Sequence, residues 1–487
     1  MSASCVAPER PVRQRLFPLH LAPIESFMLA DDQADYPMTF VVELTLTGQL
    51  HPPSWRAAVG EALERHPLLQ AVVEPGKGGL PCWRAAADRA PLVDIGPEGA
   101  ALDLPCGERL DLSRDVGLRV WVRQGPERVR VLLQFHHACA DGTGAYRFIG
   151  DLLAAYGRRT AGTKEPPELV PMRPELLRQR ARRAVAVAPL GARRLTPLAL
   201  RQAWRILVPR PASLAAPCRP QTTIPRSDSF PGFVSLSLAR DEHQRFRDAA
   251  GRAGVTPNDL LLRDLFLALA RWNEEADHAG RWLRVMMPTD LREGEDIEMP
   301  CTNLTSYVFL TRRSAACRRP DALLHSIASE TARVKRERLG TVFMDTIHGA
   351  THLRGLMPFL LRRNLCLATA VLSNAADPSR RFTARFPRRA GRLVCGNLLL
   401  EDITGVPPLR CQTRATFSIS QYERRLTVSL RCDPYLFRRA DTAAVLDRYV
   451  GRIRASAGLA DPPPCGGDDA GVGMRREAVA LAMPPVA

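Results

Sequence analysis

A proline- and arginine-rich stretch, residues 162–226, divides the 487-residue chain into two regularly patterned parts. It contains twelve arginines and Lys164 against three glutamates, a composition typical of a linker rather than of a core element. The chain is also too long to bury one compact core. The sequence therefore predicts an N-terminal lobe over 1–161, a basic crossover linker with one or two helices over 162–226, a C-terminal lobe over 227–460 and a disordered Pro/Gly-rich tail over 461–487.

Strands and helices alternate in the first part. Residues 39–47 read TFVVELTLT and are closed by Gly48, which predicts a strand. Ser54 is expected to cap a helix that Pro67 ends. Further strands are expected over 119–122 and 128–137, and a further helix over 144–156.

The second part alternates in the same way. Thr256 at the N-cap, Pro257 at the first helical position and Asp259 at the third form a strong helix start before an apolar run. Strands are expected over 233–238, 283–287, 306–310, 416–419 and 426–431, and a further helix over 241–254. Both parts are therefore predicted to be α/β.

The chain is strongly basic, with a formal net charge of +17 and a pI of about 9.9. Such a charge is found in proteins that bind nucleic acids or anionic membranes. Lysine, however, occurs only at Lys77, Lys164 and Lys335, so nearly all the positive charge is arginine. We favour codon bias in a GC-rich genome as the cause and expect no nucleic-acid partner.

The cysteines and the apolar segments indicate the compartment. Twelve cysteines are scattered without a CxxC pair, as expected of free thiols in a reducing cytoplasm. The N-terminus has no long apolar run typical of a signal peptide. The most apolar segment, 356–372, is interrupted by Arg362 and Arg363 and is too short to span a membrane. We expect a cytoplasmic protein without a transmembrane segment.

The chemistry is concentrated in residues 131–144, which read VLLQFHHACADGTG. An apolar strand delivers His136 and His137 to its end, and alternation points the two imidazoles to opposite sides. A neutral imidazole, with a pKa of about 6.5, can take up a proton at neutral pH and return it. Asp141 and Gly142 then turn the chain into the next helix, where glycine tolerates backbone angles that are closed to other residues.

The residue types alone leave three interpretations open. The histidine pair with Asp141 is a buried structural pair, a general-base site or part of a metal site. A metal site needs a third and a fourth ligand, and the nearby Cys139 matches no known zinc spacing. Cys139 also has no activating partner in sequence, so we interpret it as a spacer and not as a nucleophile.

A family resemblance favours the second interpretation. His136-His137-x-x-x-Asp141-Gly142 resembles the HHxxxDG motif of the superfamily of condensation domains and acyl-CoA-dependent acyltransferases, which includes chloramphenicol acetyltransferase. Other pieces follow in the order typical of the family, over about residues 16–456. They are Glu64-Arg65-His66-Pro67-Leu68-Leu69, Leu118-Arg119, Thr256-Pro257-Asn258-Asp259, Pro288-Thr289-Asp290-Leu291-Arg292, Asn303 and Ser373-Asn374.

The sequence also departs from some branches of the family. The DFGWG-type segment of plant members has no clear copy, and Gln70 stands where many condensation domains have Arg. Ser373-Asn374-Ala375-Ala376-Asp377 differs from the NVPGP segment of wax ester synthases. The chain is therefore most similar to alcohol-acetyltransferase-like and stand-alone condensation enzymes.

The resemblance implies a fold and residue roles. The fold would be two chloramphenicol-acetyltransferase-like lobes, with mixed sheets flanked by helices and a tunnel between the lobes. His137 would be the general base and His136 a supporting residue. Asp141 would pair with Arg292 to hold the turn, and the small Gly142 would leave room near the tunnel. Candidates for the tunnel lining are Asn303, Ser306, Ser373 and Asn374.

The implied activity is the transfer of an acyl group from a coenzyme A thioester to a hydroxyl or amine of a small molecule. The alternative is a condensation enzyme of natural-product biosynthesis, whose donor is a phosphopantetheine thioester on an acyl carrier protein. In neither case is a metal or a permanently bound cofactor expected. A third hypothesis, from a different class, is a non-catalytic binding protein with a basic linker.

Overall fold

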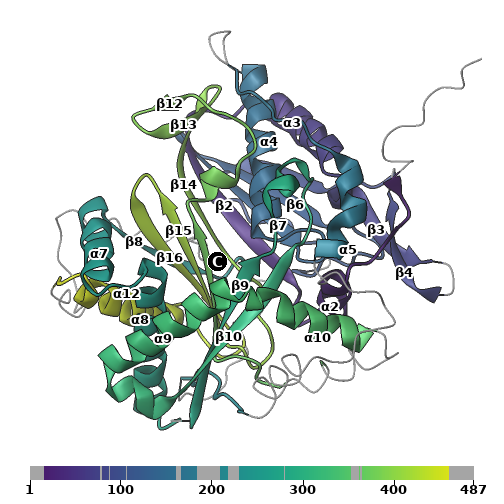
Figure 1. Ribbon diagram of the computed structural model, residues 1–487. Coiled ribbons are helices and arrows are strands. Elements are labelled where there is room, and N and C mark those ends of the chain that lie inside the picture. Colours follow the sequence, from purple (N-terminus) through teal and green to yellow (C-terminus); the bar gives the residue numbers. More distant parts are fainter. Residues whose placement is uncertain are drawn as a thin grey trace, which may run out of the picture.

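Two large sheets form the two lobes of the chain, and they lie side by side in the computed structural model (Figure 1). The structure describes residues 16–76, 79–86, 88–105, 107–160, 166–183, 209–217, 230–278, 280–351, 361 and 365–459. Within these residues the strands form a seven-stranded, a six-stranded and a three-stranded sheet. The two larger sheets mix parallel and antiparallel pairs and are flanked by helices, so the predicted fold class is confirmed.

The seven-stranded sheet forms the N-terminal lobe. Helices α3 (Pro52–Arg65) and α4 (Gly142–Thr160) pack on one of its faces, where the rings of Trp55 and Tyr156 lie 5.5 Å apart. The three-stranded sheet, β1 (Leu19–His20), β4 (Pro81–Ala85) and β3 (Ala71–Pro75), lies beside it. The strands of the large sheet, in spatial order, are β12 (Arg388–Arg389), β13 (Arg392–Cys395), β14 (Leu398–Val406), β2 (Thr39–Thr47), β7 (Arg128–His136), β6 (Leu118–Gln124) and β5 (Leu92–Pro97). The helices of this lobe are α2 (Pro23–Asp31), α3 (Pro52–Arg65) and α4 (Gly142–Thr160).

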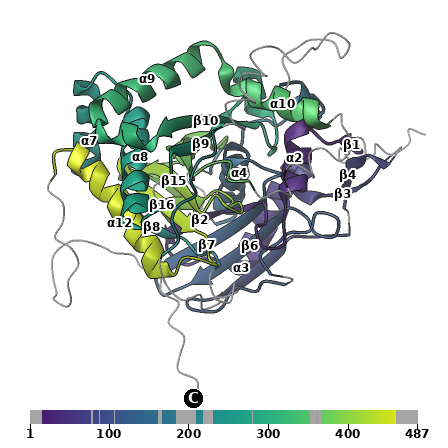
Figure 2. The same ribbon diagram turned by 90° about the horizontal axis from the view of Figure 1, so that it is seen from below.

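The six-stranded sheet forms the C-terminal lobe. Its helices, apart from α10 (Val342–Thr351), cover one face, where Phe417 on β15 (Ala415–Tyr422) packs against Tyr449 on α12 (Arg439–Ser456) with ring centroids 5.2 Å apart (Figure 2). Helix α10 packs instead against α2 of the other lobe. The strands, in spatial order, are β10 (Thr305–Arg313), β9 (Trp282–Asp290), β11 (Ala370–Ala376), β15 (Ala415–Tyr422), β16 (Arg425–Cys432) and β8 (Val234–Leu238). The helices are α7 (Arg240–Arg252), α8 (Pro257–Glu275), α9 (Pro320–Arg336), α10 (Val342–Thr351) and α12 (Arg439–Ser456).

Two helix starts were predicted, and they have different outcomes. Thr256 caps α8 as expected, because its hydroxyl accepts a hydrogen bond from the amide of Asp259 at 3.2 Å. The prediction that Ser54 caps α3 is wrong, since this helix begins at Pro52 with His51 as its N-cap. Proline suits the first turn of a helix because it has no N–H that would need a partner there.

The two lobes are not separate in sequence. Strand β14 lies far along the chain, yet it pairs antiparallel with β2 from Leu399 opposite Thr47 to Val406 opposite Val41. Strands β12 to β14 therefore extend the sheet of the N-terminal lobe, which corrects the expectation that 227–460 forms one lobe by itself (Figure 1). This pairing gives partners to the backbone groups on one side of β2, which would otherwise be an open edge.

The described pieces of the predicted linker, 166–183 and 209–217, pack against both lobes. Arg180 in α5 (Arg180–Arg183) donates to both carboxylate oxygens of Glu25, at 2.7 and 2.9 Å, and both side chains are buried. Leu177 and Leu214 are fully buried. The prediction that this stretch adds nothing to the core is therefore wrong for these residues. The rest of 162–226 and the predicted tail lie outside the described residues.

Among the helices of the described residues, none has the length and apolar character needed to cross a membrane.

Candidate active site

The two histidines of the motif stand where β7 meets the turn into α4. His136 is the last residue of β7 and lies opposite Thr39 of β2. The backbone amide of His137 continues this pairing by donating to the carbonyl of Met38 at 2.7 Å. The conformation at the histidines is therefore fixed by the central strands of the N-terminal lobe.

His136 is fully buried and supports the turn. Its Nδ1 accepts a hydrogen bond from the amide of Ala138 at 3.1 Å. Its Nε2 therefore carries the proton and lies 3.8 Å from Oδ2 of Asp32. The carboxylate of Asp32 near Nε2 favours the tautomer with the proton on that nitrogen. These contacts agree with a supporting role for His136, which stays a prediction.

His137 has different neighbours. Its ring lies against Phe40, with centroids 5.1 Å apart, and its Nδ1 lies 3.2 Å from the side-chain nitrogen of Asn303. Burial lowers the pKa of His137 below its ordinary value, although the nearby Asp141 carboxylate acts in the opposite direction. The imidazole is therefore neutral at pH 7, which is the state that a general base needs.

The carboxylate of Asp141 lies in the turn between β7 and α4 and accepts hydrogen bonds from both lobes. One of its oxygens accepts from the amide of Gly144 at 2.8 Å. The other accepts from Nη1 of Arg292 and the amide of Leu304, both at 2.7 Å, and from the hydroxyl of Thr305 at 3.0 Å. The ion pair expected between Asp141 and Arg292 is thus present.

Charge and hydrogen bonding keep this carboxylate ionised. Burial acts to raise the pKa of Asp141, but the charge of Arg292 and the hydrogen-bond donors around it outweigh that effect, so the pKa lies below its ordinary value. Arg292 also donates to the carbonyl of Thr302 at 2.8 Å and lies 3.1 Å from Asp290. Arg292 of the C-terminal lobe thus connects Asp141 of the motif with Asp290, the last residue of β9.

Two glycines follow the aspartate, and the sequence analysis assigned a role only to the first of them, Gly142. Gly142 does not have a positive φ, and a Cβ there would meet only Tyr146, at 3.8 Å. The expectation that Gly142 is needed for its backbone angles is therefore wrong. A Cβ at Gly144 would come within 2.7 Å of the Thr302 carbonyl oxygen and 3.2 Å of the Cys301 sulfur. Gly144 is the residue whose small size lets the lobes approach.

The candidates for the tunnel lining lie in different places. Asn303 is fully buried and contacts His137. Ser306 on β10 pairs with Thr289, whose side chain lies beside Gly340 in the helical layer of the C-terminal lobe. Ser373 and Asn374 are neighbours on β11, and Asn374 donates to Asn258 at the start of α8. A tunnel-lining role stays a prediction, and the contacts support it best for Asn303.

The sheet of the C-terminal lobe turns a hydroxyl-rich face toward the other lobe, which the sequence analysis missed. Adjacent strands place four serines in one register row, Ser373, Ser418, Ser429 and Ser235. Arg431 shares this face, because side chains alternate, and it donates to Glu108 of the N-terminal lobe at 2.8 Å. Hydroxyls at every second position, as in 416–420 and 427–429, were the available signal.

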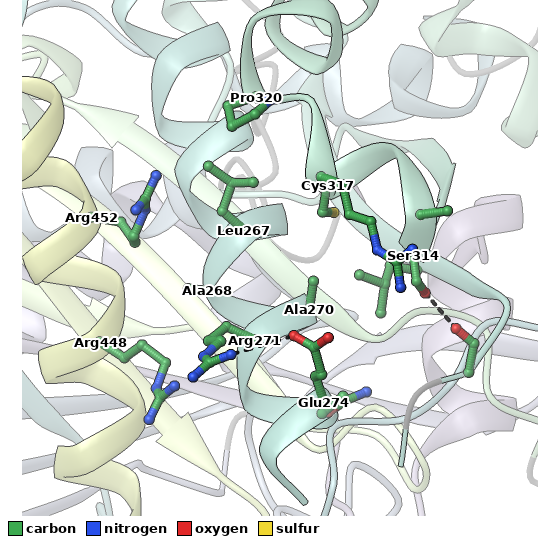
Figure 3. Close-up of a pocket in the computed structure, with 15 residues that line it drawn as sticks. Leu267, Ala268, Ala270, Arg271, Glu274, Ser314, Cys317, Pro320, Arg448 and Arg452 are labelled. Atoms are coloured by element: carbon green, nitrogen blue, oxygen red, sulfur yellow. Dashed lines mark hydrogen bonds and ion pairs between the residues drawn. The ribbon is translucent and has the colours of Figure 1, made fainter. Parts of the chain in front are cut away.

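A separate hollow of about 450 Å³ lies on the outer side of the C-terminal lobe (Figure 3). Its lining combines apolar side chains, such as Leu267 and Leu283, with the arginines Arg271, Arg318, Arg448 and Arg452. Two of these, Arg271 and Arg448, converge on Glu275 at 2.7 and 2.6 Å. Because none of its lining residues belongs to the motif, the hollow is distinct from the site around His137.

Relatives with similar sequences give partial information. No protein-family model matches the chain. The uncharacterized protein Rv2305 of Mycobacterium tuberculosis is 26% identical over 369 residues, which are 72% of this chain and 78% of that protein. A probable non-canonical nonribosomal peptide synthetase of Salinispora arenicola, CymA, is 31% identical over 165 residues, which are 31% of this chain and 2% of that protein.

Solved structures resemble nearly the whole chain. The first condensation domain of the calcium-dependent antibiotic synthetase has a TM-score of 0.63 at 14% identity, over 92% of this chain and 97% of that one. The X-domain from teicoplanin biosynthesis has a TM-score of 0.58 at 20% identity, over 94% and 97%. The starter condensation domain of rhizomide synthetase, solved with C8-CoA and Leu-SNAC, has a TM-score of 0.60 at 12% identity, over 93% and 98%. The resemblance drawn from the motif is thus confirmed at the level of architecture: the chain has the two-lobed fold of the condensation-domain superfamily.

Proposed function

We propose that this protein is a condensation-type acyltransferase that joins an acyl group from a thioester to an amine or hydroxyl, with His137 as the general base. The observation that carries the proposal is the state of His137. Its side chain is buried against Phe40 of the N-terminal lobe, Asn303 of the C-terminal lobe donates to its backbone carbonyl at 2.7 Å, and burial lowers the pKa of the ring, which favours the neutral form. A base held in this way can remove the proton of an acceptor that attacks a thioester carbonyl.

The reaction needs no covalent acyl-enzyme. As the acceptor oxygen or nitrogen attacks, a C–O or C–N bond forms, His137 takes the acceptor proton and the C–S bond breaks. The proton then passes to the departing thiolate, which leaves as a free thiol. Cys139 is a poor alternative nucleophile, because burial raises the pKa of its thiol well above the ordinary value. We therefore expect sequential kinetics with a ternary complex.

We infer that the donor is held on a carrier protein by a phosphopantetheine arm. The support is the likeness to domains of the calcium-dependent antibiotic and rhizomide synthetases, and the sequence match with CymA. The basic charge of the chain would also favour docking of an acidic carrier. Coenzyme A is the second candidate, because the rhizomide domain was solved with C8-CoA.

The test compares matched donors. The same acyl group is supplied on coenzyme A, on a carrier protein and on N-acetylcysteamine, each with pools of amines and alcohols. Thiol release is followed, and products are identified by mass spectrometry. Faster turnover with the carrier than with coenzyme A supports the carrier hypothesis, and the reverse order supports coenzyme A. Salt-dependent retention on DNA without thiol release from any donor would favour the binding-protein hypothesis.

A further inference from the structure

The hollow on the outer side of the C-terminal lobe has the size of a small-molecule site. Its volume of about 450 Å³ falls within the range of about 300–1,000 Å³ that is usual for ligand pockets. Most of its lining residues come from three elements, which are α8, the short helix η6 (Ser314–Arg318) and α12. Figure 3 shows Arg448 and Arg452 of α12 on one side of α8, and Ser314 and Cys317 on the other. A ligand in the hollow would therefore contact elements that come together only in the folded lobe.

One part of the lining is apolar. Leu267 and Ala268 of α8 and Leu283 of β9 line the hollow and are buried. Ala270 and Ala315 also line it, and their small side chains leave its space open. An apolar chain that lies against this surface is removed from water, which strengthens binding by about a factor of four for each buried methylene group.

The other part of the lining is positively charged. It contains one carboxylate, that of Glu274, and four guanidinium groups, those of Arg271, Arg318, Arg448 and Arg452. Arg271 and Arg448 are balanced by Glu274 and the neighbouring Glu275, at distances of 2.6 to 3.6 Å. In the part of the chain that the structure describes, Arg318 and Arg452 form no ion pair, and both are exposed. The hollow thus has an excess of positive charge that an anionic ligand would balance.

Arg452 is well placed to bind the anion. It lies four residues after Arg448 on α12, so the two side chains share one face of the helix. Arg448 is held by Glu275 and by Trp272, since its guanidinium lies 5.6 Å from the centre of that ring. Arg452 acts on the buried Asp264 through its charge and, among the described residues, donates no side-chain hydrogen bond. Its N–H groups are therefore available, and a guanidinium fork matches the oxygens of a phosphate group.

We propose that the hollow is a binding site for a small amphipathic phosphate ester, with the phosphate on Arg452 and Arg448 and the apolar chain against the buried surface of α8 and β9. A phosphate monoester carries a charge of about −1.5 to −2 at pH 7, so it balances two arginines better than a carboxylate does. Arg318 of η6 adds positive charge from another wall of the hollow. This inference does not rest on the proposed function, because no lining residue belongs to the motif and the tests use no thioester.

The first experiment uses octyl phosphate as the probe, because it combines a phosphate monoester with an apolar chain. Calorimetric titration of the full chain should give one site with a dissociation constant below about 1 mM. Inorganic phosphate lacks the chain and octyl glucoside lacks the charge, so each should bind at least about 10-fold more weakly. Equal binding of octyl phosphate and inorganic phosphate, or no binding of octyl phosphate up to about 1 mM, would overturn the proposal.

Two variants test where the probe binds. Arg452→Gln removes one charge at an exposed position, so it should leave the fold intact and weaken the binding of octyl phosphate by about 10-fold or more. Ala270→Trp fills the hollow but keeps every arginine, and it should weaken binding by a similar factor. Wild-type affinity in both variants would show that octyl phosphate binds elsewhere, and the assignment of this hollow would be wrong.

The matched controls lie at exposed positions of the N-terminal lobe. Arg114→Gln makes the same change in charge, and Ala57→Trp on α3 adds the same indole. Both should keep the wild-type dissociation constant. A loss of affinity in Arg114→Gln equal to that in Arg452→Gln would mean that the basic charge of the whole chain, and not the hollow, attracts the probe.

Amphipathic phosphate monoesters occur both as soluble metabolites and as lipid headgroups. Sedimentation with phosphatidylcholine vesicles that contain phosphatidic acid distinguishes these two sources. Binding to the vesicles that Arg452→Gln weakens and Arg114→Gln does not would identify a lipid headgroup as the ligand. Binding of octyl phosphate without binding to the vesicles would identify a soluble phosphate ester.

Discussion

The carboxylate of Asp141 and the guanidinium of Arg292 form an ion pair 2.7 Å long across the boundary between the two lobes. The side chains are 2% and 5% exposed, so both charges are removed from water. A buried charge that loses its partner is strongly destabilised, because neither water nor another ion compensates it. The pair therefore has to be kept or removed as a unit.

The first prediction concerns this unit. Asp141→Asn and Arg292→Met should each lower the free energy of unfolding by about 3–5 kcal/mol, and the double variant should lose less than the sum. Denaturant titration measures all three losses. Arg84→Met and Glu74→Gln form a matched control, because this pair is 3.3 Å long but about half exposed and should contribute at most about 1 kcal/mol. Additive losses at Asp141 and Arg292 would contradict the prediction.

The second prediction compares the two glycines at the start of α4. Gly144→Ala would drive a methyl group into the Thr302 carbonyl, so it should destabilise the protein by about 1–3 kcal/mol and lower the rate. Gly142→Ala meets only Tyr146, at 3.8 Å, so it should be neutral or slightly stabilising. Melting temperature and thiol release are measured for both variants. Equal changes in melting temperature and in thiol release for the two variants would contradict the close contact between the lobes at Gly144.

The third prediction concerns the base. His137→Ala should lower turnover by about 10² to 10⁴-fold while the protein stays folded, with a single cooperative melting transition. His136→Ala should lower stability at least as much as rate, because the fully buried His136 supports the turn. His325→Ala, at an exposed position of α9, serves as the control for loss of an imidazole. A near-normal rate for His137→Ala at saturating acceptor would show that another group is the base.

Local patterns predicted the elements around the site well. Alternation and an apolar run located the strand that ends at His136, and the cap at Thr256 located α8, because both signals arise within a few neighbouring residues. The pairing of β14 with β2 could not be predicted in this way. It joins residues about 360 positions apart, and nothing in the composition of residues 398–406 distinguishes one sheet from the other.

The residues of the candidate site were also predicted only in part, because local patterns do not contain the contacts between the lobes. The resemblance supplied His137, Asp141 and Arg292, and the ion pair is present. The hydrogen bond from Asn303 to His137 and the close approach of Thr302 to Gly144 are properties of the packing between the lobes. A side chain's contacts across an interface do not appear in its own sequence neighbourhood, so these contacts required the structure.

The last prediction is a loss of stability on mild acidification. His66 is fully buried, where its Nδ1 accepts from the amide of Cys301 at 2.8 Å and its Nε2 lies 3.1 Å from Asp151. Burial lowers the pKa of His66, although Asp151 opposes this effect, and burial also lowers the pKa of His137. Below pH of about 6.5 the unfolded chain therefore binds protons that the folded chain does not.

The sign follows from this difference in bound protons. The stability that the neutral histidines contribute is present above about pH 6.5 and is lost as the pH falls toward their folded pKa values, by up to about 1.4 kcal/mol per pH unit for each histidine. Urea titrations at pH 7, 6 and 5 measure the slope. His66→Asn should be less stable at every pH but show a smaller slope, and His137→Asn should also reduce the slope. His325→Asn, on the surface of α9, should keep the wild-type slope. If His66→Asn and His137→Asn both keep the full slope, other groups must take up the protons.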